Sequence, residues 1–352
     1  MAYTTIDDPS AYFQTAIYTG NGTGQAITFD GNSDMQPDFF WGKCRSTSSG
    51  HHLQNSTTGV KPFLVSNSTG AENTDSNNTD FLSYDSNGFT LGASYQTDIN
   101  HDTRTYVAWN WKANGGTTAS NTDGTITSTV QANTDAGFSI ISYTGNGSDG
   151  ATIGHGLNQT PEIFFPKCLS TSTNWEMYYF PTGGTRQYGY LNLTNAFDTW
   201  PHNAPSSTII SLSGSGDSNG NGRTNIGYAF HSVQGYSKIG TYKGNGSSTV
   251  GEGPFIYTGF KPAWTIIKRT DASSDGWYIH DSTRSPNNVI NTAFRANVNN
   301  AESTENIDYL SNGFAIRIGA NNNFNNASGT YFYMAFAESP FVSSEGVPTT
   351  AR

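Results

Sequence analysis

The sequence has little charge and almost no cysteine. Charged residues make up 12% of the chain, with 17 Lys and Arg against 27 Asp and Glu. The basic residues form no patch or stripe that could neutralise phosphates, which argues against a nucleic-acid partner. The two cysteines, Cys44 and Cys168, are too few for a disulfide framework. Histidines at metal-ligand spacing are also missing, so no zinc site is predicted.

Long hydrophobic runs are missing as well. No stretch approaches the roughly 20 apolar residues of a membrane span. The first residues, Met1–Asp8, combine neither a basic region nor an apolar run, so we expect synthesis without a signal peptide. Low charge also argues against the common disordered class, in which net charge is high.

The chain is instead rich in turn-forming and aromatic residues. It holds 39 Gly, 19 Tyr, 21 Phe and 7 Trp, together with many Ser, Thr and Asn. Aromatic and β-branched residues favour strands, while Gly and Asn supply the positive-φ positions of tight turns. An all-β protein with many short strands is predicted.

One turn motif occurs three times. Tyr18–Gly22, Tyr143–Gly147 and Tyr242–Gly246 each end in Gly-Asn-Gly and follow an alternating, strand-like run. Asn-Gly after such a run indicates a β-hairpin.

Two further strands follow each turn at similar distances. A Pro-x₅-Lys strand occurs at Pro37–Lys43, Pro161–Lys167 and Pro262–Lys268. A closing strand holds alanine beside an aromatic residue, at Ala108, Ala229 and Ala335, which lie 65, 62 and 67 residues beyond the lysines. Three internal copies in one register are therefore predicted.

The copies define the expected domains. Residues 1–116, 137–235 and 236–341 are predicted to form three tandem antiparallel β-sandwiches of jelly-roll type. The Thr/Ser/Asn/Gly-rich segment 117–136 is expected to be a linker, and 342–352 a C-terminal tail. Pro166 is expected to interrupt the pairing of its strand.

Tryptophans separate into two groups. Those at repeated positions, such as Trp175 and Trp277, are expected in the core. Trp41, Trp111 and Trp200 lie outside the repeated positions and are candidates for ligand or interface contacts. Cys44 and Cys168 follow the repeated lysines, and packing is the favoured interpretation of both.

Two motifs suggest chemistry. Gly145–Gly150 spells GxGxxG, but no helical pattern follows, so a turn is favoured over a dinucleotide site. Asp217, Asn219 and Asn221 match the first half of a calcium loop, although the closing glutamate position is Tyr228. They are candidate calcium ligands, and no other cofactor and no catalytic residue is predicted.

Several longer strings resemble a family of repeat domains of unassigned function in virion proteins of marine tailed phages, those of cyanobacteria and marine heterotrophs. They include Ile6–Phe13, Tyr106–Gly115, Gly235–Gly246 and Met334–Phe341. The resemblance implies a concanavalin-type, lectin-like sandwich in a phage particle, with no catalytic residues.

The expected function is that of a non-enzymatic structural protein of the virion, as a capsid decoration or a head or tail fibre component. Its expected partners are other virion proteins and further copies of itself, without nucleic acid or membrane. One alternative is a receptor-binding adhesin that recognises a host surface polysaccharide. Another is a carbohydrate-active enzyme, which would need two carboxylates about 5–10 Å apart.

Overall fold

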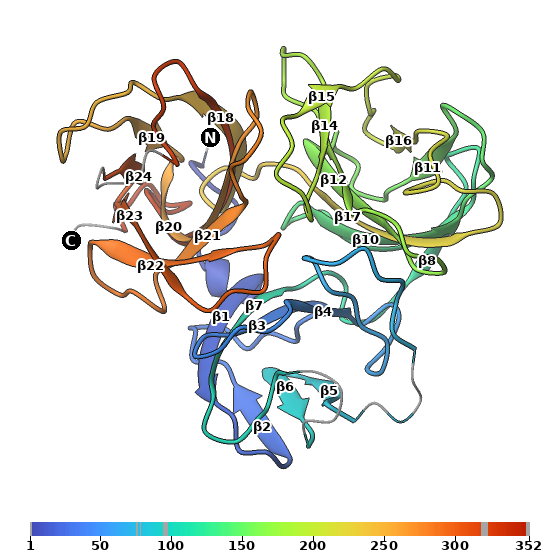
Figure 1. Cartoon of the computed structure of the whole chain (residues 1–352), viewed down its shortest axis with the longest axis horizontal. Coiled ribbons are helices and arrows are strands. Elements are labelled where there is room, and N and C mark those ends of the chain that lie inside the picture. The colour runs from blue at the N-terminus through green and yellow to red at the C-terminus, as the bar shows by residue number, and fades with distance from the viewer. Residues whose placement is uncertain (1, 75–76, 78, 94–97, 318–322, 350–352) are drawn as a thin grey trace.

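Three β-rich units surround a common centre in the computed structural model of the chain (Figure 1). The structure describes all residues except 1, 75–76, 78, 94–97, 318–322 and 350–352. We define unit 1 as residues 1–116, unit 2 as 117–235 and unit 3 as 236–341. The predicted all-β class is confirmed, since in the described residues strands are joined mainly by turns and loops.

The elements are numbered along the chain. Unit 1 contains the 3₁₀ turn η1 (Pro9–Ala11) and strands β1 (Phe13–Thr19), β2 (Gln25–Thr28), β3 (Phe39–Cys44), β4 (His52–Asn55), β5 (Phe81–Asp85), β6 (Gly88–Leu91) and β7 (Thr105–Trp111). Unit 2 contains β8 (Ala119–Asn121), β9 (Ser128–Asn133), β10 (Phe138–Thr144), β11 (Thr152–Gly154), β12 (Ile163–Cys168), β13 (Glu176–Tyr179), β14 (Gln187–Tyr190), β15 (Asp198–Thr199), β16 (Ile209–Ser211) and β17 (Thr224–Phe230). Unit 3 contains β18 (Ser237–Lys243), β19 (Phe255–Tyr257), β20 (Phe260–Arg269), β21 (Tyr278–Asp281), β22 (Ile290–Arg295), β23 (Ser303–Leu310), β24 (Gly313–Ile316) and β25 (Thr330–Pro340).

The same four-strand order occurs in every unit. It is β1-β7-β3-β4 in unit 1, β10-β17-β12-β13 in unit 2 and β18-β25-β20-β21 in unit 3. In each case the strand before the Gly-Asn-Gly turn and the Pro-x₅-Lys strand flank the closing strand, with antiparallel pairing. The strands predicted at these three repeated positions are all present.

The predicted alignment of the closing strand is wrong by two residues in unit 1. Trp111 pairs with Phe13 and Phe39, whereas Phe230 pairs with Phe138 and Ile163 at the corresponding positions. The residue equivalent to Ala229 is therefore Asn110, not Ala108. A slip of two leaves the inward and outward alternation unchanged, so the hydrophobic pattern could not reveal it.

The Gly-Asn-Gly turn does not form the predicted hairpin. Strand β1 pairs with β7, while β2, which follows the turn, pairs with β6 in another sheet. In unit 2, β10 and β11 are likewise in different sheets. The turn connects two layers of the unit.

The segment expected to be a linker belongs to a sheet. Strands β8 and β9 form an antiparallel pair, and β9 extends the main sheet of unit 2 by pairing with β10. The crossover before β8 is held by Asp38, which accepts hydrogen bonds from the N–H groups of Ala113, Gly115 and Gly116 at 2.7–2.9 Å. The Thr/Ser/Asn/Gly-rich composition of segment 117–136 therefore reflects short strands and turns.

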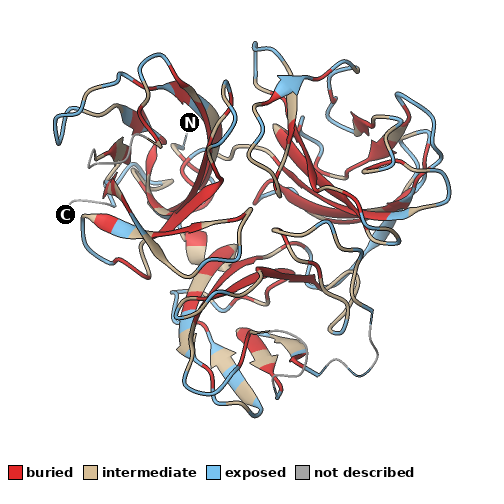
Figure 2. Cartoon of the chain, in the orientation of Figure 1, coloured by how far each residue is buried: buried red, intermediate tan, exposed pale blue. Residues whose placement is uncertain are grey.

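The central strands of each main sheet are buried on both faces (Figure 2). In β3, Phe40 contacts a core formed with residues of β5 and β6, while Phe39 and Trp41 belong to a central core. That central core includes residues of all three units. Because both faces are covered, β3 and β12 are continuously buried instead of alternating.

Equivalent hydrogen bonds join neighbouring units. His51 Nδ1 accepts a hydrogen bond from Trp41 Nε1 (2.9 Å), so its Nε2 carries the proton that it donates. A ring nitrogen from each unit reaches a backbone carbonyl of another, in the bonds Trp175 Nε1 to Val65 O (3.0 Å), Trp277 Nε1 to Tyr190 O (2.9 Å) and His51 Nε2 to Arg295 O (3.1 Å). Unit 2 thus binds unit 1, unit 3 binds unit 2, and unit 1 binds unit 3.

Two backbone hydrogen bonds repeat at the same interfaces. The N–H groups of Glu72, Phe197 and Glu302 donate to the carbonyls of Leu169, Thr270 and Arg45, at 2.9, 2.8 and 3.3 Å. Those of Ser49, Thr173 and Ser274 donate to the carbonyls of Asn299, Thr69 and Thr194, at 2.8, 2.8 and 3.2 Å. The three units therefore form a closed ring, in which unit 1 contacts unit 3.

The N-terminal segment packs against the body of the chain and against the described part of the tail. Thr4 Oγ1 donates to Gln234 O (2.7 Å), and Ile6 is buried in the central core. Within the tail predicted at 342–352, Ser344 N donates to Asp7 Oδ1 (2.6 Å). The described part of the tail thus packs against the N-terminal segment.

Candidate functional site

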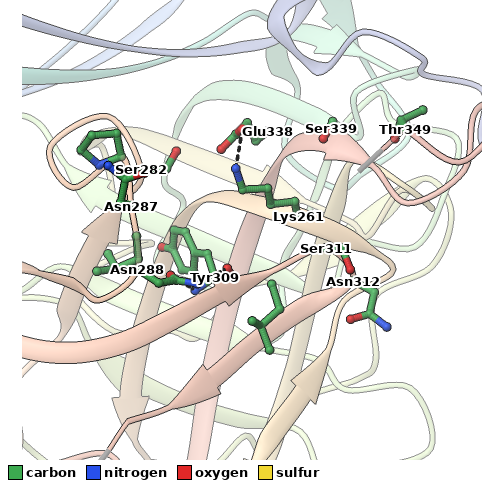
Figure 3. Close-up of a pocket in the computed structure, with 13 residues that line it drawn as sticks. Lys261, Ser282, Asn287, Asn288, Tyr309, Ser311, Asn312, Glu338, Ser339 and Thr349 are labelled. Atoms are coloured by element: carbon green, nitrogen blue, oxygen red, sulfur yellow. Dashed lines mark hydrogen bonds and ion pairs between the residues drawn. The ribbon is translucent and has the colours of Figure 1, made fainter. Parts of the chain in front are cut away.

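A polar hollow of about 730 Å³ lies in unit 3 (Figure 3). Its wall combines the start of β20, the segment after β21, the β23–β24 turn and the end of β25. These segments are far apart in sequence and are brought together because β20 pairs with both β21 and β25. The volume is within the usual range of small-molecule sites, about 300–1,000 Å³.

Two interactions fix the wall of the hollow. Asn288 Nδ2 donates to Tyr309 O (2.8 Å), and its Oδ1 accepts from Tyr309 N (2.9 Å), which holds the segment after β21 against β23. Lys261 Nζ lies 2.7 Å from Glu338 Oε1. These are the cation and the carboxylate of the lining, so its charges are balanced.

Four further polar side chains of the lining have no internal partner. Ser282, Asn287, Asn312 and Ser339 form no side-chain hydrogen bond within the part of the chain that the structure describes. Together they present hydroxyl and amide groups, which both donate and accept hydrogen bonds.

The equivalent turn of unit 1 is used differently. Asn87, which corresponds to Asn312, accepts a hydrogen bond from Met35 N (3.3 Å) and donates to Phe29 O (3.3 Å). In unit 1 this amide therefore holds the fold together. In unit 3 the amide of Asn312 is available to a ligand.

The structure corrects the prediction for three tryptophans. Trp41, Trp111 and Trp200 are 6%, 1% and 3% exposed, so none is available for an outside contact. Trp41 and Trp111 contribute to the central core, where Trp111 occupies the position of Phe230. The two-residue slip in the alignment had placed Trp111 outside the repeat. Trp200 packs on Tyr178, with ring centroids 4.0 Å apart.

The loop proposed for calcium includes a buried structural asparagine. Asn219 Oδ1 accepts from Asn146 N (3.0 Å), and its Nδ2 donates to Ser148 O (2.8 Å). Asp217 Oδ1 accepts from Asn174 N (3.0 Å). Protein donors already occupy these oxygens. Calcium binding by Asp217, Asn219 and Asn221 remains a prediction.

The hydrogen bonding of Asn219 to its turn, which we call the asparagine clamp, occurs in all three units. Asn100, Asn219 and Asn325 are each buried and bind the Gly-Asn-Gly turn of their unit. Their Oδ1 atoms accept from the N–H groups of Asn21, Asn146 and Asn245, at 3.1, 3.0 and 2.8 Å. The sequence does carry a signal for this contact, because each asparagine precedes the equivalent residues Tyr106, Asn225 and Tyr331 by six positions. The wrong alignment of the closing strand in unit 1 hid this common spacing.

The clamp explains the repeated glycines and tyrosines. A side chain at Gly145 would lie 2.5 Å from Gly220 O, and Gly147 has a φ of 71°, so both positions favour glycine. Tyr143 donates its hydroxyl hydrogen to Ser218 O (2.6 Å), next to Asn219. The GxGxxG match therefore reflects a turn held by the clamp.

The repeated lysines are buried near the interfaces. Lys167 Nζ donates to Thr173 O (2.8 Å) and to Thr69 O of unit 1 (3.2 Å). Lys43 and Lys268 occupy the equivalent positions, and burial lowers the pKa of all three lysines to about 8. Cys44 and Cys168 beside them are buried and unpaired, as expected for packing residues.

The described residues contain no cluster of three or more His, Cys, Asp and Glu side chains that could hold a metal ion. No helix among them has the length and apolar character needed to cross a bilayer.

The hollow was not predicted from the sequence. Its local signal is Pro286-Asn287-Asn288, which resembles many other polar turns of this chain. The lining residues extend from Lys261 to Thr349, which are 88 positions apart, and no spacing rule groups them.

Comparison with known proteins gives a family without an assigned activity. Residues 8–340 match DUF7483, described as a domain of unknown function. No curated protein and no solved structure matches the chain. The match extends through all three units as one domain, and the chain therefore belongs to the DUF7483 family.

Proposed function

We propose that this chain is a structural protein on the exterior of a phage particle, as a capsid decoration or a head or tail fibre component. The observation that carries the proposal is the closed ring of three units around one core. Such a body is held at three interfaces by equivalent hydrogen bonds, which suits a rigid part of a larger assembly. The resemblance of strings such as Met334–Phe341 to virion proteins of marine tailed phages supports the same function.

The finer fold assignment belongs to this proposal. We infer that each unit is a two-layer sandwich of jelly-roll, lectin-like type. Support comes from the smaller sheets β2-β6-β5 and β11-β16, which share cores with the outer faces of the main sheets. On the particle, we expect contacts with other virion proteins and with further copies of this chain.

The location of the chain tests this proposal. Phage particles purified from an infected culture would be analysed by mass spectrometry and labelled with gold-conjugated antibody against the chain. We expect its peptides in intact particles and gold at regular positions on the outer surface. Absence of the chain from purified particles would overturn the proposal.

A second candidate function is that of a receptor-binding adhesin for host surface polysaccharide. The observation that favours it is the hollow of unit 3, where the side chains of Ser282, Asn287, Asn312 and Ser339 form no hydrogen bond within the described part of the chain. Adsorption of phage to host cells would test it, with purified chain added as a competitor. Undiminished adsorption at saturating competitor would overturn this candidate.

A further inference from the structure

The structure assigns the hollow of unit 3 as a binding site for a neutral, hydroxyl-rich oligosaccharide. This inference deepens the adhesin candidate by naming a site and a ligand class. It does not depend on where the chain sits in a particle.

The charge of the hollow selects against ionic ligands. Lys261 is the cation among the lining residues, and its Nζ lies 2.7 Å from Glu338 Oε1. A phosphate, sulfate or uronate would have to displace this carboxylate to reach the ammonium group. The chain as a whole has a net charge of −10, which adds no attraction for an anion.

The polar groups of the hollow match hydroxyls. Asn287 and Asn312 can each donate and accept through their amides, and Ser282 can do both through its hydroxyl. A sugar hydroxyl likewise donates and accepts, so adjacent hydroxyls can be bound by such groups without a net charge. Ion pairing then supplies no essential part of the affinity.

Apolar side chains complete the lining. Pro286 and Leu310 lie among the polar groups and are both exposed, Leu310 by 38%. They can cover the C–H surface of a sugar ring, while polar neighbours bind its hydroxyls. A purely apolar ligand would leave the amides and hydroxyls without partners, which costs free energy.

The shape of the hollow favours more than one sugar. Its volume of about 730 Å³ is in the upper half of the usual range for small-molecule sites, about 300–1,000 Å³. Two parts of its wall, the segment after β21 and strand β23, are held together by the hydrogen bonds between Asn288 and Tyr309. Little rearrangement is therefore needed on binding.

A printed glycan array tests the inference. The purified full chain would be applied to neutral and anionic bacterial oligosaccharides. We expect binding to a subset of the neutral ones. Asn287→Ala should weaken this binding about three- to tenfold, because one hydrogen bond is lost. Asn287→Trp, which fills the hollow, should abolish it.

The matched control is Asn203→Ala, which removes another exposed asparagine without a side-chain hydrogen bond, in unit 2. It should bind like the unaltered chain. Unchanged thermal unfolding of every variant would show that each is folded. An array without neutral ligands, preference for anionic ones, or binding that survives Asn287→Trp would each overturn the inference.

The result of the glycan-binding test can be distinguished from the result of the test of the virion function. A chain that is found on particles but binds no neutral glycan would refute the site alone. A chain that binds glycans through Asn287 but is absent from particles would refute the virion function alone.

Discussion

Single residues of this chain show why its turn motif occurs three times. Asn100, Asn219 and Asn325 are buried, and each binds the central asparagine of the Gly-Asn-Gly turn in its own unit through both atoms of its amide. A buried donor or acceptor that loses its partner costs about 1–3 kcal/mol. The repeated turn is therefore part of the stability of each unit.

Removing the clamp of unit 2 should destabilise the chain. Asn219→Ala leaves Asn146 N without its acceptor, so we expect the free energy of unfolding to fall by about 1–3 kcal/mol. Asn221→Ala, an exposed neighbour in the same loop, should change it by less than about 0.5 kcal/mol. Urea unfolding without calcium measures both.

The same two variants distinguish the clamp from a calcium site. If Asn219→Ala and Asn221→Ala lowered the free energy of unfolding equally, and only when calcium is present, the result would contradict the clamp and favour calcium binding by this loop.

Glu72 should make stability depend on pH. It is partly buried at the interface between units 1 and 2, and burial raises its pKa to about 7. Between pH 4.5 and 7 the folded chain holds this proton while the unfolded chain releases it. Stability should therefore fall as pH rises through this range, by about 1 kcal/mol after allowance for partial exposure.

Glu72→Gln removes this ionisation, so its advantage over the unaltered chain should grow from pH 5 to pH 8 in urea unfolding. The equivalent residue of unit 3 supplies the control. Glu302 lies 2.6 Å from Arg45 Nε and 3.3 Å from Arg284 Nη1, so Glu302→Gln should destabilise at pH 8. A constant difference between Glu72→Gln and the unaltered chain at all pH values would refute the assignment.

At the scale of the element, the Pro-x₅-Lys strands carry a shared buried charge. The lysines of β3, β12 and β20 are 0–1% exposed. Their pKa is lowered to about 8, so above pH 8 the folded chain loses protons that the unfolded chain keeps until about pH 10.5. Stability should therefore rise from pH 8 to 9.5, by about 1 kcal/mol for each lysine.

Thermal unfolding between pH 7 and 9.5 measures this rise below the ionisation range of exposed tyrosines. The triple variant Lys43→Met, Lys167→Met, Lys268→Met should lose the rise. The exposed Lys243→Met should keep it. An equal rise in the triple variant would show that other groups cause it.

The sequence predicted strands better than their partners. Alternation and turn residues located β1, β3 and β7 and their equivalents, because these signals are local. The hairpin prediction failed because the Gly-Asn-Gly turn is shaped by Asn100, about 80 residues away. The sequence could not reveal the two-residue error in the alignment of the closing strand of unit 1, because a shift of two residues keeps each side chain on the same face of the sheet.

Pro166 is a second case in which the strand was predicted better than its pairing. Its strand β12 pairs with β17 along its length, but with β13 only at Ile163 and Phe164. The equivalent strands β3 and β4 pair at four positions. The expected interruption is thus confined to one edge.

The hollow of unit 3 could not be predicted at all, because its wall depends on how β20, β21 and β25 are paired.

At the scale of the whole molecule, three similar units share one core. A buried ion pair takes part in the interface between units 1 and 3. There Trp109 Nε1 donates to Asp281 Oδ2 (2.9 Å), and Arg284 Nε lies 2.5 Å from the same oxygen. The ion pair is buried, and Arg284 also lies over the ring of Phe294 at 4.7 Å. This contact ties unit 1 to unit 3 and so closes the ring.

The central claim is that the three units are one closed body. Differential scanning calorimetry of the intact chain tests it most directly. A shared core predicts one transition, with the calorimetric enthalpy equal to the van't Hoff enthalpy. Asp281→Asn, which weakens the contact between units 1 and 3, should lower the midpoint of that single transition. Separate transitions, or a shift confined to one part of the trace, would contradict the closed ring.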